Sequence, residues 1–413
     1  MYIWYVAIYE PLPIGGEHSR RMRVGLLASY LRESGHEVEI WLPDFDHIKH
    51  EEYSETEKIE FSKGDYKIEF LKGCKYKKDS SFIRYFHNKK IASRFKALAS
   101  QRARQPDLII SQIPALELAE AVIEHASKSN IPTVIDVRDL WPDVYKRLLP
   151  KRFSKLLGFI LWREYKRLKK VLQYSTTVTA VSKTYLEWAT THSGRKFPDT
   201  NVHFLGYDQN QKVNVNLSWA QFCAEKSIPE NKVYIFFSGT FCDSYDFRPI
   251  CCSAQYFDAR NDSRYHFIVA GEGELDEHVR DTLEKAGNIS LVGWLNESEL
   301  RLCLSNVHLG LAPYDRGALM SLTNKLFEYL AYGLPIISSL RGELFSIIEK
   351  NSVGENYDSE TDCSLSDAIL NLTVNQEVYN GYRSRARRLY KSQYSTDAIY
   401  SLFVKQIELI GKK

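Results

Sequence analysis

The chain has 413 residues, of which 44% are hydrophobic and 26% charged, and its formal net charge is +3. This composition is typical of a globular protein, and the length exceeds a single hydrophobic core, which favours two domains of about 100–200 residues each. The seven cysteines form no CxxC pair and no Cys/His grid, which argues against a structural zinc site and favours a reducing compartment. No apolar run approaches the roughly 20 residues that span a bilayer, and the first residues lack the features of a signal peptide, so we expect a cytoplasmic protein.

The small net charge conceals an uneven distribution. Residues 1–215 contain 35 Lys and Arg against 26 Asp and Glu, a balance of +9, whereas residues 216–413 contain 20 against 26, a balance of −6. This division suggests that the first half faces a polyanion or an anionic surface.

Strand and helix patterns alternate along the chain. Tyr2–Tyr9 has the continuous apolar character of a buried strand, His18–Ser34 has helical periodicity, and Val38–Leu42 is the next strand. Residues 44–80 are charged and weakly patterned, which predicts an irregular segment or a β-hairpin. Further strands are predicted at Leu108–Ser111, Thr133–Val137, Thr176–Val181, Val202–Leu205, Val233–Ser238, His266–Ala270, Ile289–Val292, Leu309–Ala312 and Pro335–Ser338.

Helical patterns separate most of these strands, which is typical of parallel α/β sheets, here two in tandem. The polar stretch from Gly206 to Asn231 contains no strand pattern and marks the expected boundary. We therefore expect one domain over residues 1–205 and a second over residues 206–390.

Two glycine-containing turns follow predicted strands. Gly15-Gly16 precedes a helix, where glycines let the backbone approach a ligand and direct helix N–H groups at an anion; a plain turn is an equally good interpretation. Gly271-Glu272-Gly273 follows a strand at the edge of a parallel sheet where ligands bind. The dinucleotide fingerprint GxGxxG is absent from the first turn, which disfavours a nicotinamide enzyme.

The segment SLTNKLFEYLAYGLP, residues 321–335, carries the most chemical information. A helix is predicted from Asn324 to Tyr332, ended by Gly333. The helix N-terminus and Lys325 would attract a phosphate, and Glu328, one turn further on, could accept hydrogen bonds from a ribose diol. A surface pair of Lys325 and Glu328 is the alternative.

An ordered series of motifs runs through nearly the whole chain. It comprises Gly15-Gly16, DVRDLWPD at 136–143, Thr179–Ser182, FSGT at 237–240, VAGEGEL at 269–275, LVGW at 291–294, LAPY at 311–314 and NKLFEYLAYGLP at 324–335. With these motifs the chain resembles the retaining glycosyltransferases of family 4. The DLWPD form is similar to the bacterial branch that builds O-antigen lipopolysaccharide, capsule and exopolysaccharide.

The resemblance implies the GT-B fold, an α/β architecture in which two Rossmann-like, doubly wound parallel-sheet domains face a cleft. It further implies that a C-terminal helix, within residues 391–413, crosses back to the first domain. In such enzymes the first domain binds the acceptor, the second holds the nucleotide-sugar, and Gly16 reaches the donor from the first domain. The donor-binding residues expected on this basis are Gly15, Gly16, Gly239, Thr240, Gly271, Gly273, Ser321, Leu322, Thr323, Asn324 and Glu328, with Glu328 on the ribose.

Two positions depart from the family pattern. The family's paired glutamates lie eight positions apart, and the earlier position here is Met320, so the donor sugar must be recognised differently. Many members also carry an Arg/Lys pair after the strand that corresponds to Val233–Ser238, where Arg248 alone fits loosely. Lys325 would supply the missing charge, and both residues are catalytic candidates.

Asp139 is the third catalytic candidate, because it follows a predicted strand near the position where the family often has an acceptor-side histidine or aspartate. Its carboxylate could orient or deprotonate the acceptor hydroxyl. Arg138 is expected to bind the acceptor, or else to pair with Asp136 or Asp143 and fix the loop. Trp141 could stack on a sugar or lipid of the acceptor, or pack at the edge of the cleft.

The sequence Asp44-Phe45-Asp46 matches the DxD metal motif of the other glycosyltransferase fold. In a GT-B pattern we interpret this match as chance. Because a helix dipole and cations can stabilise a leaving diphosphate, we expect no metal and no cofactor beyond the nucleotide-sugar co-substrate, with UDP as the expected nucleotide.

Two basic tracts remain in the first half. Residues 84–104 contain seven Lys and Arg and no acid, and residues 146–170 contain ten against Glu164, interleaved with aromatic and aliphatic residues. Such helices suit an anionic membrane surface. A solvated charged face is the alternative, and no nucleic-acid-binding motif accompanies the charge, so we expect no nucleic acid partner.

Together these features predict a glycosyltransferase that acts on a saccharide or polyprenyl-linked saccharide acceptor at the inner face of the cell membrane. Two alternatives stay open. One is a GT-B epimerase that converts a nucleotide-sugar without an acceptor. The other is a catalytically silent nucleotide-sugar-binding subunit, which Met320 and the missing basic pair would favour.

Overall fold

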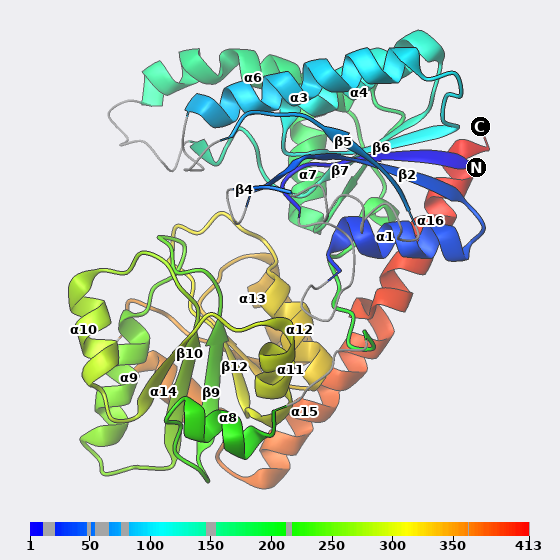
Figure 1. Cartoon of the computed structure of the whole chain (residues 1–413). Helices are drawn as coiled ribbons and strands as arrows, with labels where there is room; N and C mark the ends of the chain where they lie inside the picture. Colours follow the sequence, from blue (N-terminus) through cyan, green and yellow to red (C-terminus); the bar gives the residue numbers. More distant parts are fainter. Residues whose placement is uncertain are drawn as a thin grey trace. The chain divides into compact units, whose positions relative to one another are not determined.

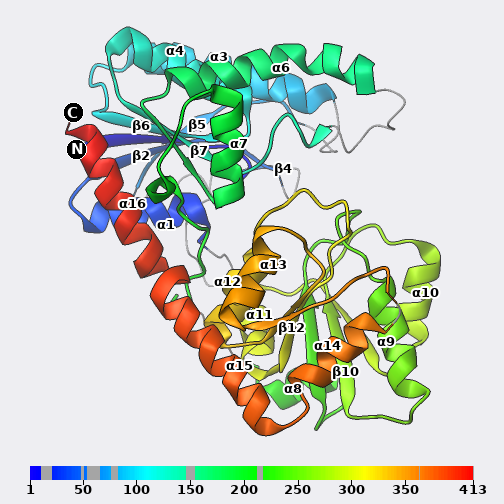
Figure 2. The same ribbon diagram turned by 180° about the vertical axis from the view of Figure 1, so that it is seen from behind.

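The structure, a computed structural model, describes residues 1–10, 21–47, 51–53, 66–75, 82–145, 154–211, 217–361 and 363–412. These residues form two compact units (Figures 1 and 2). Unit 1 contains the described residues up to Glu10, Arg21–Leu205 and those from Ile399 onward, and unit 2 contains the described residues of Gly206–Ala398.

Unit 1 is built on six parallel strands in the order β5-β2-β1-β6-β7-β8. Its strands are β1 (Tyr2–Val6), β2 (Glu37–Pro43), β3 (Phe45–Asp46), β4 (Glu51–Glu52), β5 (Lys67–Leu71), β6 (Leu108–Ile113), β7 (Thr133–Val137) and β8 (Thr177–Ala180). Its helices are α1 (Arg23–Glu33), α3 (Phe82–Gln101), α4 (Leu116–Ser129), α6 (Ser154–Tyr174), α7 (Lys183–Ser193), the 3-10 helix η2 (Asp199–Asn201) and α16 (Thr396–Gly411), which begins in unit 2.

Helices cover both faces of the unit 1 sheet (Figure 1). Ile3 and Tyr5 of β1 pack in the cluster that contains α1 and α16, whereas Trp4 and Val6 pack in the cluster that contains α3 and α4. This alternation follows from the two-residue period of a strand, and a parallel sheet is normally buried on both faces. The last helix, α16, contributes Phe403 and its apolar neighbours to the core of unit 1.

One expectation for unit 1 is wrong, and another is incomplete. Val202–Leu205 is not a strand, since it makes an isolated bridge between Val202 and Ala180 after the 3-10 helix. The charged segment 44–80 contains the short antiparallel pair of β3 and β4, which agrees with the predicted β-hairpin. It also contains β5, which was not predicted and which pairs in parallel with β2 as an edge strand. An edge strand needs no continuous apolar run, so its sequence pattern is weak.

Unit 2 has its own six-stranded parallel sheet, in the order β11-β10-β9-β12-β13-β14. Its strands are β9 (Val233–Ser238), β10 (Tyr265–Ala270), β11 (Ile289–Gly293), β12 (Leu309–Ala312), β13 (Ile336–Ser338) and β14 (Gly354–Asn356). Its helices are α8 (Trp219–Glu225), α9 (Arg248–Asp258), α10 (Glu277–Lys285), α11 (Glu297–Asn306), α12 (Asn324–Tyr332), α13 (Glu343–Asn351), α14 (Ser364–Leu372), α15 (Gln376–Leu389) and the π-helix η3 (Tyr390–Tyr394).

Helices α9, α10 and α14 pack on one face of this sheet in a single apolar cluster. From α12, the buried hydroxyl of Tyr329 donates to the carbonyls of Phe236 (3.2 Å) and Leu311 (3.0 Å), which ties that helix to β9 and β12. The three-residue strand β14 was missed because it is short, polar and at the edge of the sheet. Two units with parallel sheets confirm the predicted α/β class.

Within the ranges that the structure describes, no helix is both long enough and apolar enough to cross a membrane.

Candidate functional site

Both sheets have the same order, in which the chain begins in the middle, moves to one edge and then returns to build the other half. The strands on either side of this reversal are β1 and β6 in unit 1, and β9 and β12 in unit 2. In doubly wound sheets ligands bind beyond the carboxyl ends of the strands at such a switch point. The residues that follow these strands are therefore the first candidates for a site.

In unit 2, the loops after β9 and β10 pack on each other through glycines. The N–H of Gly239 donates to the carbonyl of Ala270 (3.0 Å). A Cβ on Gly271 would lie 1.9 Å from the carbonyl oxygen of Gly239, and one on Gly273 would lie 2.2 Å from that of Phe241. Backbone packing thus requires Gly271 and Gly273 independently of any ligand, and their role in donor binding stays a prediction.

Lys325 is buried at this end of β9 and β12. The residue is 6% exposed, and its ammonium lies 4.8, 4.6 and 5.7 Å from the ring centroids of Phe237, Tyr245 and Tyr314. Among the described residues no carboxylate forms an ion pair with it. Glu328 is also buried, at 5% exposure, so the alternative of a surface pair is wrong. Because an ammonium without a nearby carboxylate is costly to bury, this position favours an anionic ligand.

The N-terminus of α12 is capped by the side chain of Thr323, the residue before the helix. The hydroxyl of Thr323 accepts the N–H of Lys325 (3.0 Å), and the hydroxyl of Ser321 donates to Glu343 (2.8 Å). Leu322 is buried and Asn324 is half-buried. The capping bond holds the first turn of α12 in place, while the predicted contacts of residues 321–324 with a diphosphate stay predictions.

Arg248 lies in a different environment from Lys325. It is the first residue of α9, its side chain is 70% exposed, and its guanidinium binds the buried carboxylate of Asp246 through two hydrogen bonds of 2.8 and 2.7 Å. Thr240, in the loop after β9, is exposed. Arg248, which loosely matches the basic pair of the family, is thus bound to a carboxylate of its own loop, whereas Lys325 is buried.

In unit 1, an ion pair lies at the switch point. The guanidinium of Arg138, which follows β7, donates to the carboxylate of Glu10 and to the side chain of Gln112 (2.7 Å). Glu10 also accepts the N–H of Val24 (2.5 Å). Glu10 follows β1 and Gln112 lies near the end of β6, so the two bonds from Arg138 connect the strands that flank the reversal.

The two partners that the sequence suggested for Arg138 were wrong. Asp136 is fully buried and is bound by Arg23 through bonds of 2.6 and 2.9 Å, and by the hydroxyl of Thr179 (2.9 Å). Burial alone would raise the pKa of Asp136, but the Arg23 guanidinium and these hydrogen bonds outweigh it and lower the pKa below that of an ordinary aspartate. Asp143 is bound by side chains of α6 and α7. Sequence reasoning missed Arg23, because 113 residues separate it from Asp136 and no motif contains it.

Asp139 is half-buried just after β7, and its carboxylate accepts the N–H of Leu140 (2.8 Å). Burial raises the pKa of Asp139, although hydrogen bonds from Leu140 and Trp141 oppose the rise. A raised pKa brings a carboxylate closer to the range in which a general base acts, whereas the local hydrogen bond serves to hold the loop. Its action on an acceptor stays a prediction.

Trp141 belongs to an aromatic cluster. Its ring lies 6.3 Å from that of Tyr9 and 5.1 Å from that of Tyr145. The guanidinium of Arg84 lies 4.2 Å from the ring centroid of Tyr9 and 5.1 Å from that of Trp141. Tyr9 and Arg84 were missed as members of this group because they come from separate elements, and stacking of Trp141 on an acceptor stays a prediction.

Gly15 and Gly16 lie outside the described residues. Asp44 and Asp46 of the DxD match are both buried, and Asp44 accepts the N–H of Gly73 (3.2 Å). In the part of the chain that the structure describes, no group of three or more His, Cys, Asp or Glu side chains could hold a metal ion.

Several side chains of the two basic tracts bind carboxylates of unit 1. Helices α3 and α6 both pack on α4 (Figures 1 and 2). Lys96 of α3 binds Glu124 (2.6 Å), and Arg167 and Lys170 of α6 bind Glu120 at 2.8 and 3.0 Å. Part of the positive charge is thus neutralised within the unit. Residues 146–153 lie outside the described residues.

The same helices expose large apolar side chains. Ile83 and Phe86 of α3 are 51% and 60% exposed, and Trp162 of α6 is 54% exposed with the ammonium of Lys166 3.9 Å from its ring centroid. Exposed apolar residues beside cations are typical of surfaces that contact membranes.

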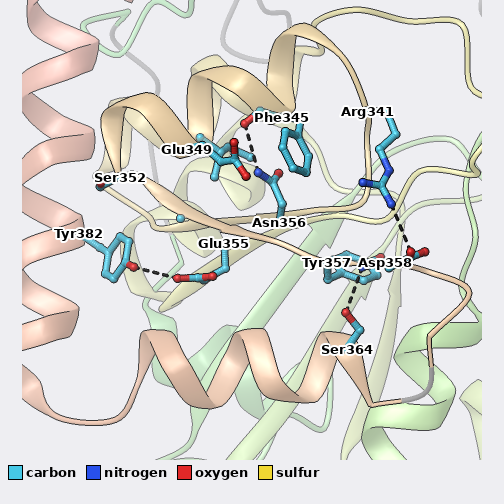
Figure 3. A pocket seen from close by; sticks show the side chains of 12 residues that line it. Arg341, Phe345, Glu349, Ser352, Glu355, Asn356, Tyr357, Asp358, Ser364 and Tyr382 are labelled. Atoms are coloured by element: carbon cyan, nitrogen blue, oxygen red, sulfur yellow. Dashed lines mark hydrogen bonds and ion pairs between the residues drawn. The ribbon is translucent and has the colours of Figure 1, made fainter.

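A cavity of about 520 Å³ lies elsewhere in unit 2, beside β14 and α13 (Figure 3). Its carboxylates, from Glu349, Glu355 and Asp358, outnumber its guanidinium, that of Arg341. Asp358 binds Arg341 (3.2 Å), and Glu355 accepts the hydroxyl of Tyr382 (2.8 Å). The negative lining disfavours a diphosphate, so this cavity is not the candidate donor site.

Two family models match the chain, one in each unit. Residues 22–205 match the model described as Glycosyltransferase Family 4, and residues 234–375 match the model described as Glycosyl transferases group 1. The chain is a glycosyltransferase. The second match contains Lys325, Glu328 and the loops after β9, β10 and β12.

Solved structures have the same fold over the full length of the transferase. HepE from Anabaena, in complex with UDP, is 12% identical with a TM-score of 0.65, and the match covers 99% of this chain and 100% of that chain. The corresponding values for sucrose-phosphate synthase from Thermosynechococcus elongatus are 14%, 0.70, 99% and 98%. WaaG, a glycosyltransferase involved in lipopolysaccharide biosynthesis, gives 12%, 0.64, 99% and 99%. At these identities the likeness establishes the fold alone, which is GT-B. No curated protein matches the transferase in sequence.

Proposed function

We propose that the transferase moves a sugar from a UDP-sugar to an acceptor hydroxyl and retains the anomeric configuration. The observation that carries this proposal is the buried ammonium of Lys325, at the switch point of unit 2 and in the first turn of α12. A helix N-terminus and a cation together favour a phosphate group. The UDP complex of HepE, which has the same fold, supports UDP as the nucleotide.

In this proposal unit 2 binds the donor. The diphosphate binds Lys325 and the N-terminus of α12, and the ribose hydroxyls donate to the buried carboxylate of Glu328. Lys325 then stabilises the charge that develops on the departing diphosphate. The other donor-binding candidates are Gly239, Thr240, Gly271, Gly273, Ser321, Leu322, Thr323 and Asn324, with Arg248 as a second cation.

Unit 1 binds the acceptor in this proposal. Asp139 orients the acceptor hydroxyl, and Arg138 and Trp141 line its surroundings. The acceptor oxygen bonds to the anomeric carbon on the face from which the diphosphate leaves, and the hydroxyl proton passes to a departing phosphate oxygen. This course needs no protein nucleophile, and none is assigned.

We further propose that the transferase acts at the inner face of the cell membrane, on a saccharide or polyprenyl-linked saccharide used in surface-polysaccharide biosynthesis. The exposed side chains of Ile83, Phe86 and Trp162 support a peripheral contact, because apolar groups beside cations bind anionic lipid surfaces. The resemblance to the bacterial surface-polysaccharide branch supports the acceptor class.

Titration calorimetry with UDP, GDP, ADP, CDP and dTDP tests the donor proposal, followed by transfer assays with sugars of the nucleotide that binds. We expect UDP to bind most tightly and the product glycoside to keep the anomeric configuration of the donor by NMR. An epimerised nucleotide-sugar without an acceptor would contradict the proposal and favour the epimerase. Donor binding without transfer to any saccharide would favour a silent subunit.

Flotation with vesicles of anionic and of neutral lipid tests the membrane contact. Phe86→Asp with Trp162→Asp is expected to reduce binding to anionic vesicles at low salt. Val374→Asp in unit 2, where the valine is 68% exposed, is the matched control and should bind like the wild-type protein. If the wild-type protein does not bind anionic vesicles at low salt, a soluble acceptor becomes the better proposal.

A further inference from the structure

The hydrogen bonds of the Lys325 ammonium leave it with capacity for a ligand. An ammonium has three N–H donors, and one of them binds the hydroxyl oxygen of Tyr245 at 2.7 Å. Its other neighbours are the rings of Phe237, Tyr245 and Tyr314. Rings attract a cation through their faces but do not accept N–H groups as an oxyanion does, so two donors of this buried group have no oxygen partner among the described residues.

Residue 239 is a glycine, and a side chain at this position would crowd the pair of polar groups. A Cβ at Gly239 would lie 3.0 Å from Nζ of Lys325 and 3.3 Å from the hydroxyl oxygen of Tyr245. Both polar atoms therefore border the same small volume, directly after β9. An oxygen atom at hydrogen-bond distance from one of them would be within reach of the other.

Tyr245 is held in place by the loop after β12. Tyr245 and Tyr314 form an antiparallel bridge, flanked by a bond from the N–H of Asp246 to the carbonyl of Pro313 (2.9 Å) and one from the N–H of Asp315 to the carbonyl of Ser244 (2.9 Å). The loops after the two strands of the switch point are thus joined by backbone hydrogen bonds. The position of the Tyr245 hydroxyl follows from this junction and not from the ammonium alone.

The proton of the Tyr245 hydroxyl is available to a ligand. Its oxygen accepts from Lys325, so the O–H group can donate elsewhere. Among the described residues, the acceptor near enough to receive it is the hydroxyl oxygen of Tyr314 at 3.5 Å, which is long for an O–H···O bond. An anionic oxygen between Gly239 and Lys325 would be a stronger acceptor.

We propose that Tyr245 and Lys325 form a two-donor clamp that binds one phosphate oxygen of the donor diphosphate over Gly239. The inference rests on the proposed function and adds Tyr245 as a residue that touches the donor. The clamp would take the place of the basic pair that related enzymes carry after the corresponding strand, since Arg248 is exposed and bound to Asp246. One charged donor and one neutral donor would then hold this phosphate oxygen.

Calorimetric titration of the full chain with UDP, pyrophosphate and uridine tests the clamp. Tyr245→Phe removes one hydroxyl and keeps the ring, and we expect UDP and pyrophosphate to bind about tenfold more weakly while uridine binding stays unchanged. Lys325→Met should weaken UDP and pyrophosphate binding by about tenfold to a hundredfold. The matched control is Tyr382→Phe, whose hydroxyl lies in the separate cavity of Figure 3 and whose loss should leave all three affinities unchanged.

The double variant Tyr245→Phe/Lys325→Met shows whether the two groups act on one oxygen. If they do, its loss of UDP affinity is smaller than the product of the two single losses, because partners in one interaction are not additive. Tyr245→Phe with wild-type affinity for UDP and pyrophosphate would overturn the clamp and leave the proposed function standing. Wild-type protein that binds pyrophosphate through Tyr245 but no nucleoside diphosphate would support the clamp and contradict the proposed donor.

Discussion

The two units share one sheet topology but differ in what surrounds the cation at the switch point. Each has a six-stranded parallel sheet that reverses direction in the middle, and each places a buried or nearly buried cation beyond the strands at that point. In unit 1 the guanidinium of Arg138 is paired with the carboxylate of Glu10, whose side chain is 1% exposed. In unit 2 the ammonium of Lys325 has a tyrosine hydroxyl and three rings around it.

The difference indicates which switch point is prepared for an anion. In a buried ion pair each charge has its partner, so the Glu10–Arg138 pair joins strand ends and has little net charge left to attract an anion. A buried ammonium without a carboxylate has no charge of opposite sign beside it, and the binding of an anion lowers its electrostatic free energy. Among the described residues the two switch points thus differ by one carboxylate partner, and in the proposed function this difference decides which of them binds the anionic donor.

The largest expected effect is on stability, and it should differ between variants of the two units. Arg138→Met leaves the buried carboxylate of Glu10 without its cation, which should lower the free energy of unfolding by about 3–5 kcal/mol. Lys325→Met removes an incompletely solvated charge and should cost less than about 1 kcal/mol, or raise stability. Urea denaturation followed by circular dichroism measures both, with Glu10→Leu/Arg138→Met as the control that removes the whole pair. Equal losses for the two single variants would remove the distinction between the units.

The next effect concerns nucleotide binding in unit 2. Glu328→Ala should weaken UDP binding by about 1.5–3 kcal/mol, roughly tenfold to a hundredfold, because a charged hydrogen-bond partner of the ribose is lost. Transfer should nearly disappear while the thermal midpoint of the protein changes little. Glu355→Ala, in the cavity of Figure 3, is the matched control. Unchanged calorimetric affinity for UDP in Glu328→Ala would show that this carboxylate does not bind the nucleotide.

A smaller effect is expected in unit 1, from Asp139→Asn. This change keeps the shape of the side chain and removes its charge, so turnover should fall by about tenfold, or roughly 1.4 kcal/mol, with donor affinity preserved. Because burial raises the pKa of Asp139, the acidic limb of the wild-type pH–rate profile should lie above the range of ordinary aspartates. Activity should fall as the pH drops through that pKa, and the limb should vanish in the variant. A parallel loss of donor affinity would assign Asp139 to the donor or to the fold.

The smallest expected effect is that of a chelator. The proposed mechanism stabilises the diphosphate with Lys325 and the N-terminus of α12, so EDTA in excess should leave the initial rate within the error of the assay. Loss of transfer with EDTA, restored by manganese or magnesium, would contradict this mechanism. Asp44→Asn and Asp46→Asn would then show whether the DxD match in unit 1 holds the ion.

The local sequence determined much of the fold and part of the site. Continuous apolar runs predicted most of the strands correctly, because a strand buried on both faces needs them at every position. The run from Asn324 to Gly333 predicted α12 with its glycine end, since the capping signals are local. For the same reason, Lys325 and Glu328 could be named as candidates from their spacing on one helix.

Only the tertiary structure decided which buried charges have a partner of opposite charge. Asp136 bonds to Arg23 across 113 residues, Arg138 to Glu10 across 128, and Lys325 to Tyr245 across 80. No local pattern reports these pairs, because burial and partners are set by which loops meet at the carboxyl ends of the sheets. Sequence also could not separate Lys325 from the exposed Arg248: both are basic residues near a predicted phosphate site, and the difference between them is desolvation, which exists only once the chain has folded.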